Sequence, residues 1–169
     1  MRNTLRIPTE SHSQEWLSIW ILTEKYNFMI ERESIMTIEE LKIKALSNEL
    51  DIDIEEAEEL IESGDYQVLT DEEADDQCAE YIKDSVWAFN SSFLSSMTGL
   101  PEEMYKAVQD KCEGAEDAVL QCIENSCGIE DFIEAAVDAD GRGHFMSSYD
   151  GEEIECQIDG QYLYIYRIN

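Results

Sequence analysis

Negative charge is the feature of this sequence that most restricts how the chain can fold. Forty Asp and Glu residues face eleven Lys and Arg, which gives a formal net charge of -29. A small domain typically carries a charge of magnitude roughly 2–8, and a larger excess destabilises a compact state through self-repulsion. Hydrophobic residues nevertheless make up 43% of the chain, as in globular proteins. We therefore expect a folded core beneath a strongly anionic surface.

The charge is concentrated in one part of the chain. Residues 1–35 hold four basic and five acidic side chains, whereas residues 36–169 hold seven basic and thirty-five acidic ones. We predict a near-neutral N-terminal extension over residues 1–35 and an acidic α+β domain over residues 36–169. A domain of that size is roughly 36 Å across, a length over which duplex DNA carries about 21 charges. The acidic domain and a DNA duplex thus have a similar charge for their length.

This charge balance restricts the partners of the protein. No basic stripe is present to neutralise phosphates, so we expect no direct binding of nucleic acid. The partners that fit are cationic, namely a nucleic-acid-binding protein, a polycation or a metal ion. A second copy of the chain, which would form a homodimer, is a further candidate partner.

Cysteine usage and hydropathy indicate the compartment. The five Cys residues are odd in number and form no CxxC pair, and the N-terminus lacks the pattern of a signal peptide. We expect reduced thiols, no cofactor, and a cytoplasmic location in a bacterial host cell. The longest apolar stretch, residues 16–22, is too short and too interrupted to span a bilayer.

Helix-start signals divide the middle of the chain. Thr37 with Glu40 and Thr70 with Glu73 each form a capping-box pattern. Because the first of these directly follows Met36, one hypothesis is that Met36 is an alternative start. Apolar spacing and Gly, Pro and Asn signals predict helices over residues 37–48, 54–62, 71–89, 91–97, 101–112, 116–125 and 129–138.

The C-terminus follows a strand pattern. Residues 154–158 and 161–168 flank Asp159-Gly160, a strong β-hairpin signal. Two strands alone are marginal, so the hairpin must pack on the helices or find a third strand. Residues 66–69 are expected to be a short extended link. The predicted fold is mainly α, with several short helices and a C-terminal β-hairpin.

Two acidic segments are the candidate partner-binding residues. Like charges three or four residues apart on a helix repel each other, yet no basic residue lies between Asp51 and Glu80. A surface selected only for solubility would interleave the two signs. We therefore predict a surface aimed at a basic cleft, in which these carboxylates stand in for phosphates: Asp51, Asp53, Glu55, Glu56, Glu59, Asp71, Glu72, Glu73, Asp75 and Asp76.

The segment from residue 138 to residue 153 has several interpretations. An EF-hand is disfavoured, because alignment of the loop on Asp138 places Arg142 at a ligand position and Tyr149 where a Glu is required. Asp138, Asp140 and His144 are a candidate metal set, and His144 with Ser147 or Ser148 is a candidate nucleophile pair. The alternatives are a Gly-rich connection into the hairpin, or a partner contact through three secondary contact candidates: Arg142, His144 and Tyr149.

Three segments carry a resemblance. Residues 69–75 (LTDEEAD), 81–90 (YIKDSVWAFN) and 142–153 (RGHFMSSYDGEE) resemble segments of uncharacterised acidic small proteins of phages and mobile elements. The chain is also similar in charge and size to phage anti-restriction DNA mimics. These resemblances imply a phage or mobile-element setting and add no mechanism.

The expected function is therefore inhibition of a host defence factor, such as a restriction or CRISPR protein, by an acidic nucleic-acid mimic without catalysis. The alternatives are an acidic structural or regulatory phage protein, a metal-dependent enzyme that uses residues 138–144, and a halophilic origin of the charge.

Overall fold

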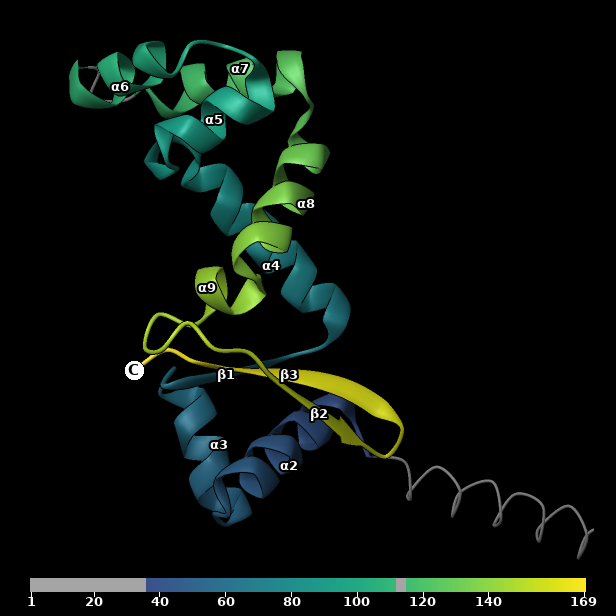
Figure 1. The fold of residues 1–169 in the computed structure, drawn as a ribbon. Helices are drawn as coiled ribbons and strands as arrows, with labels where there is room; N and C mark the ends of the chain where they lie inside the picture. The colour runs from purple at the N-terminus through teal and green to yellow at the C-terminus, as the bar shows by residue number, and fades with distance from the viewer. Residues whose placement is uncertain (1–35, 112–114) are drawn as a thin grey trace, which may run out of the picture. The chain divides into compact units, whose positions relative to one another are not determined.

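The computed structural model describes residues 36–111 and 115–169. The predicted extension over residues 1–35 lies outside the described residues and stays a prediction. The described part is mainly helical, with a three-stranded antiparallel sheet in the order β1-β3-β2 (Figure 1). The α+β class predicted from the sequence is thereby confirmed.

The sheet contains the predicted hairpin and one strand that the sequence did not indicate. Strands β2 (Ile154–Ile158) and β3 (Gln161–Arg167) pair around Asp159 and Gly160. Both turn residues have positive φ, 50° and 86°, as a type I′ turn requires. The expected link over residues 66–69 is in fact strand β1 (Tyr66–Leu69), which pairs with β3. It supplies the third strand that the marginal hairpin needs.

The central strand β3 is buried on both faces from residue 163 to residue 166, which explains why Tyr and aliphatic residues alternate there. On one face, Leu163 and Ile165 join Val68 in a core with helices α2 (Ile38–Leu50) and α3 (Ile54–Glu62). On the other face, Tyr164 and Tyr166 join a larger core. The helices α4 (Asp71–Asp84), α8 (Ile129–Asp140) and α9 (Arg142–Met146) contribute to this second core.

Helix α4 is shorter than the predicted helix over residues 71–89, so that prediction is wrong at its C-terminal end. The Ser85 hydroxyl donates to the Tyr81 carbonyl at 2.6 Å and competes with the helical hydrogen bonds. A 3₁₀ turn η1 (Val86–Ala88) follows, and Phe89 is extended at φ -62° and ψ 150°. The bend places Asn90 as the N-cap of the next helix, where its side chain accepts from the Ser92 N–H.

The remaining helices match the predicted positions to within a few residues. Helix α5 (Ser91–Thr98) ends at Gly99, which has φ 72°, and α6 (Glu102–Lys111) and α7 (Glu116–Ser126) follow. The Gly-rich connection expected after α8 contains the short helix α9. Within the described residues, no helix has the length and apolar character needed to cross a bilayer.

Candidate partner-binding surface

The first acidic segment surrounds helix α3. Asp53 is its N-cap and accepts a hydrogen bond from the Glu56 N–H at 2.9 Å. Asp51 precedes it with φ 54°, a left-handed conformation that Asp tolerates better than most residues. The helix has no basic residue in its last turn. Its polar face consists of five exposed carboxylates: Glu55, Glu56, Glu58, Glu59 and Glu62.

The second acidic segment opens helix α4 with the predicted capping box. The Thr70 hydroxyl accepts from the Glu73 N–H, and the Glu73 carboxylate accepts from the Thr70 N–H at 2.8 Å. Lys42 of α2 also pairs with Glu73 at 2.9 Å. Burial raises the pKa of Glu73, but the Thr70 N–H and Lys42 together outweigh it and hold the pKa below its usual value. The Glu73 carboxylate is thus already bound by groups of the chain itself and stabilises the fold.

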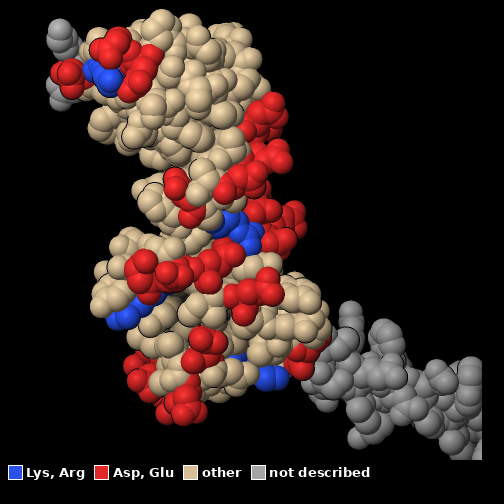
Figure 2. Space-filling view, in the orientation of Figure 1, with Lys and Arg blue, Asp and Glu red and all other residues tan. Residues whose placement is uncertain are grey.

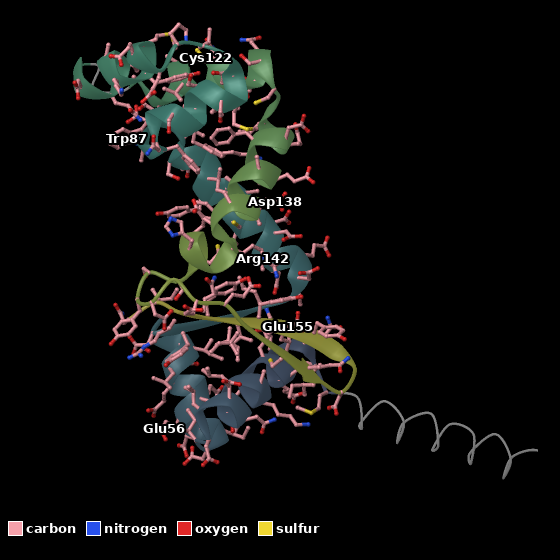
Figure 3. The ribbon with its side chains drawn as sticks, viewed as in Figure 1. Glu56, Trp87, Cys122, Asp138, Arg142 and Glu155 are labelled. Carbon is pink, nitrogen blue, oxygen red and sulfur yellow. The ribbon has the colours of Figure 1, made fainter. Side chains whose placement is uncertain are left out.

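Arg142, which is labelled in Figure 3, forms ion pairs with three further carboxylates. Its Nη1 lies 2.8 Å from Asp71 Oδ1 and 2.7 Å from Asp75 Oδ1, and its Nε donates to Glu153 Oε2 at 3.0 Å. The guanidinium lies 4.3 Å from the centre of the Tyr164 ring, within cation–π distance. Burial lowers the pKa of Arg142, but the three carboxylates outweigh it and raise the pKa above its ordinary value.

The same network extends into the core. The Tyr166 hydroxyl donates to Glu153, and burial, followed by that carboxylate, raises the pKa of Tyr166 well above its usual value. Burial also raises the pKa of the nearby Cys78 thiol to about 11, so this thiol is a core group and not a nucleophile. Of the described cysteines, Cys78, Cys122, Cys127 and Cys156 are free.

The ten predicted carboxylates therefore do not form one surface. The α3 group and the α4 group belong to helices that pack on opposite faces of the sheet. Within the α4 group, Asp71, Glu73 and Asp75 hold intramolecular cations. Glu72 and Asp76 remain exposed, and neither has an ion pair within the described part of the chain.

The structure adds a second acidic helix that the sequence-based site did not include. Helix α8 contacts α4 and buries Phe132 and Ala136. Each helix carries three exposed carboxylates at four-residue intervals on the side away from its buried stripe. We call these two rows the α4–α8 flank: Glu72, Asp76 and Glu80 on α4, and Glu130, Glu134 and Asp138 on α8.

Figure 2 shows Asp and Glu side chains in a column along the edge where α8 and α4 lie in Figure 1. Four residues of helix rise by about 6 Å, so each row presents roughly one charge per 6 Å of its helix. A single DNA strand carries one charge per ~3.4 Å and a duplex one per ~1.7 Å. Each row taken alone therefore has a lower charge density than a single strand.

The alternative site residues in the 138–153 segment do not assemble. Within residues 36–111 and 115–169, no three His, Cys, Asp or Glu side chains are grouped so that they could hold a metal ion. The proposed metal set of Asp138, Asp140 and His144 is therefore not brought together. Ser147 is 3% exposed, and its hydroxyl lies 2.7 Å from two acceptors, Asp150 Oδ1 and the Arg167 carbonyl oxygen, which share its single proton.

The secondary contact candidates have different environments. The Arg142 side chain is 12% exposed and lies inside its carboxylate network. Tyr149 is 58% exposed, and the Arg167 guanidinium lies 3.6 Å from the centre of its ring. His144 is exposed and lines a pocket with Asp140 and Tyr81. Their role in partner contact stays a prediction.

Comparison of the chain with protein-family models, with curated proteins and with solved structures found no match.

Proposed function

We propose that this protein is an anti-defence inhibitor of phage or mobile-element origin. It acts as an acidic mimic that occupies the basic cleft of a host protein that binds DNA or RNA. The observation that carries the proposal is the α4–α8 flank, with six exposed carboxylates on two helices that contact each other. The proposal involves no catalytic step.

The physical support comes from what each carboxylate already does. Asp71, Glu73 and Asp75 hold cations of the chain itself, and helix dipoles favour acidic residues in a first turn. Glu80 and Asp138 have neither reason for their positions, because both lie beyond the first turns of their helices and outside any ion pair of the described residues. Carboxylates that repel one another and have no internal cation are better explained if a partner supplies the cation.

The two acidic surfaces have similar lengths. At about 1.5 Å per residue, each row of the flank, from residue 72 to 80 and from residue 130 to 138, spans about 12 Å, and the α3 carboxylates from residue 55 to 62 span about 10 Å. The flank differs in that its charge comes from two helices that contact each other. Association should be fast at low salt and should weaken as salt increases.

The test compares two variants that remove the same charge from different surfaces. The flank variant carries E72Q, D76N, E80Q, E130Q, E134Q and D138N, and the α3 variant carries D51N, E55Q, E56Q, E58Q, E59Q and E62Q. Each loses six carboxylates. The tagged proteins are used to capture host factors from a bacterial lysate at low salt, followed by elution with increasing salt or with competing DNA or RNA.

We expect the wild-type protein and the α3 variant to recover a basic nucleic-acid-binding protein, which salt and the competing nucleic acid both release. The flank variant should lose it. Equal capture by both variants would contradict the mimicry and leave an acidic structural or regulatory protein. Loss with the α3 variant alone would place the surface on α3.

A further inference from the structure

A small pocket lies on the aromatic side of α4. Its volume is about 240 Å³, and it is lined by the C-terminal half of α4, the bend at residues 88–90, the last residue of α8 and part of α9. Four rings and one carboxylate define it: Tyr81, Phe89, His144, Phe145 and Asp140. None of these residues belongs to the α4–α8 flank.

The rings form a connected wall around Phe145. The centre of the Phe145 ring lies 6.4 Å from that of Tyr81, 6.0 Å from that of Phe89 and 5.0 Å from that of His144. Phe89 is held in place, because Gln109 Nε2 donates to its carbonyl at 2.8 Å. Tyr81, although large and aromatic, is 54% exposed. The aromatic wall is therefore in place before any ligand binds, and part of its ring surface is exposed to solvent.

Size restricts the occupant. Pockets for drug-sized ligands and cofactors have volumes of roughly 300–1,000 Å³, so this one is too small for a nucleotide. A cavity of about 150 Å³ holds one benzene molecule, so 240 Å³ leaves room for a planar group with an aliphatic stem. The dimensions therefore suit one long side chain of a partner.

Charge determines the kind of side chain. The faces of aromatic rings attract cations, and Asp140 supplies the one carboxylate among the residues that line the pocket. Asp140 is the last residue of α8, where the helix dipole disfavours negative charge. Helix stability therefore does not explain it. A guanidinium fits both the rings and the carboxylate, since it stacks on ring faces and pairs with a carboxylate through two parallel hydrogen bonds.

We infer that this pocket receives an arginine side chain from the basic partner, with the guanidinium stacked on the aromatic wall and paired with Asp140. The inference rests on the proposed function for the partner's basic character. It adds a specific anchor to a surface that would otherwise recognise charge alone.

The test measures binding of a short peptide, acetyl-Gly-Arg-Gly-amide, by NMR of the full chain at constant ionic strength. We expect saturable shifts of the Tyr81 and His144 ring signals, with a dissociation constant in the millimolar range. The citrulline peptide, which has the same shape without the charge, should bind at least tenfold more weakly. Peptides with Lys or trimethyl-Lys should also bind more weakly, because neither can form the paired hydrogen bonds.

Two variants with matched charge locate the contact. D140N should weaken binding of the arginine peptide at least fivefold, whereas D131N, which removes the same charge from an exposed residue in the first turn of the same helix, should leave it within twofold. Y81L should also weaken it. Equal binding of the citrulline peptide, or equal effects of D131N and D140N, would overturn the inference. If the peptide fails to bind while the flank variant still loses its basic partner, the inference fails and the proposed function stands.

Discussion

Arg142 joins segments that are far apart in the sequence. Its guanidinium holds Asp71 and Asp75, about seventy residues away, together with Glu153. Replacement by Met would leave these carboxylates to repel one another beside a buried Tyr ring. We expect R142M to lower the free energy of unfolding by about 2–3 kcal/mol, because Arg142 and Glu153 are largely buried whereas Asp71 and Asp75 are mostly exposed.

Urea denaturation would measure this loss. The control is K106M, which removes the same positive charge from two exposed pairs, with Glu102 and Glu103, and should lower the free energy of unfolding much less than R142M does. If R142M and K106M lower the free energy of unfolding equally, Arg142 stabilises the fold only through its effect on the net charge.

Gly143 allows helix α9 to approach the loop before β2. A Cβ at this position would lie 2.6 Å from the Gly151 carbonyl oxygen and 2.8 Å from two backbone atoms of residues 152 and 153. Because backbone atoms cannot move aside as a side-chain end can, we expect G143A to lower the free energy of unfolding by about 2–3 kcal/mol.

The comparison for G143A is G64A. Gly64 has φ 79° and nothing within 4 Å of its Cβ position, so only conformational strain of about 1 kcal/mol is expected there. Thermal unfolding followed by circular dichroism measures both variants. A smaller loss for G143A than for G64A would show that the loop moves away without resistance.

Among the elements, helix starts were predictable and the contacts between segments were not. The Thr70–Glu73 capping box and the Asp53 and Asn90 caps depend on residues two or three positions apart, which the sequence displays directly. The end of α4 depends instead on the Ser85 hydroxyl and on the extended Phe89. Strand β1 exists because β3 reaches it from nearly a hundred residues away, and no local pattern contains that partner.

The candidate site, like the fold, was predictable from the sequence only where it depends on neighbouring residues. The acidic runs of α3 and α4 were visible in the sequence, but the choice between outward and paired carboxylates depends on Lys42 and Arg142. The α8 row was also visible, as Glu130, Glu134 and Asp138 at four-residue spacing. It was missed because apolar residues interrupt it, so that its local density of acidic residues is lower.

The capping box of α4 makes a prediction about pH. The pKa of Glu73 is lowered in the folded protein, so its charge stabilises the fold above the pKa of the unfolded chain, near 4.3. That stabilisation is lost as the pH falls through the folded pKa. We therefore expect wild-type protein to exceed E73Q in stability at pH 7, with a difference that shrinks below about pH 4.5.

Urea midpoints from pH 7 to pH 3 measure the difference. E72Q is the matched control, because Glu72 is exposed and has no ion pair within the described residues. E72Q should not lower the midpoint at pH 7. A difference between wild type and E73Q that stays constant with pH would contradict the role of the ionised Glu73.

At the scale of the whole molecule, self-repulsion and internal ion pairs respond to salt in opposite directions. The Debye length falls from about 30 Å at 0.01 M to about 10 Å at 0.1 M salt. Salt therefore screens repulsion among widely spaced carboxylates more than it weakens the close contacts of Arg142. With a net charge of -29, we expect NaCl to stabilise the fold by about 2 kcal/mol over this range, which raises the Tm by roughly 6 °C.

Calorimetry at both salt concentrations tests this prediction, with the flank variant as the comparison. Because that variant lacks six carboxylates, its Tm should rise less with NaCl than that of the wild-type protein. A chain that unfolds at 0.01 M NaCl would favour the halophilic explanation of the charge. A Tm that falls as NaCl is added would mean that the pairs made by Arg142 and Lys42 outweigh the repulsion. The α4–α8 flank would then be stable without a partner, and the main physical reason for an external cation would be removed.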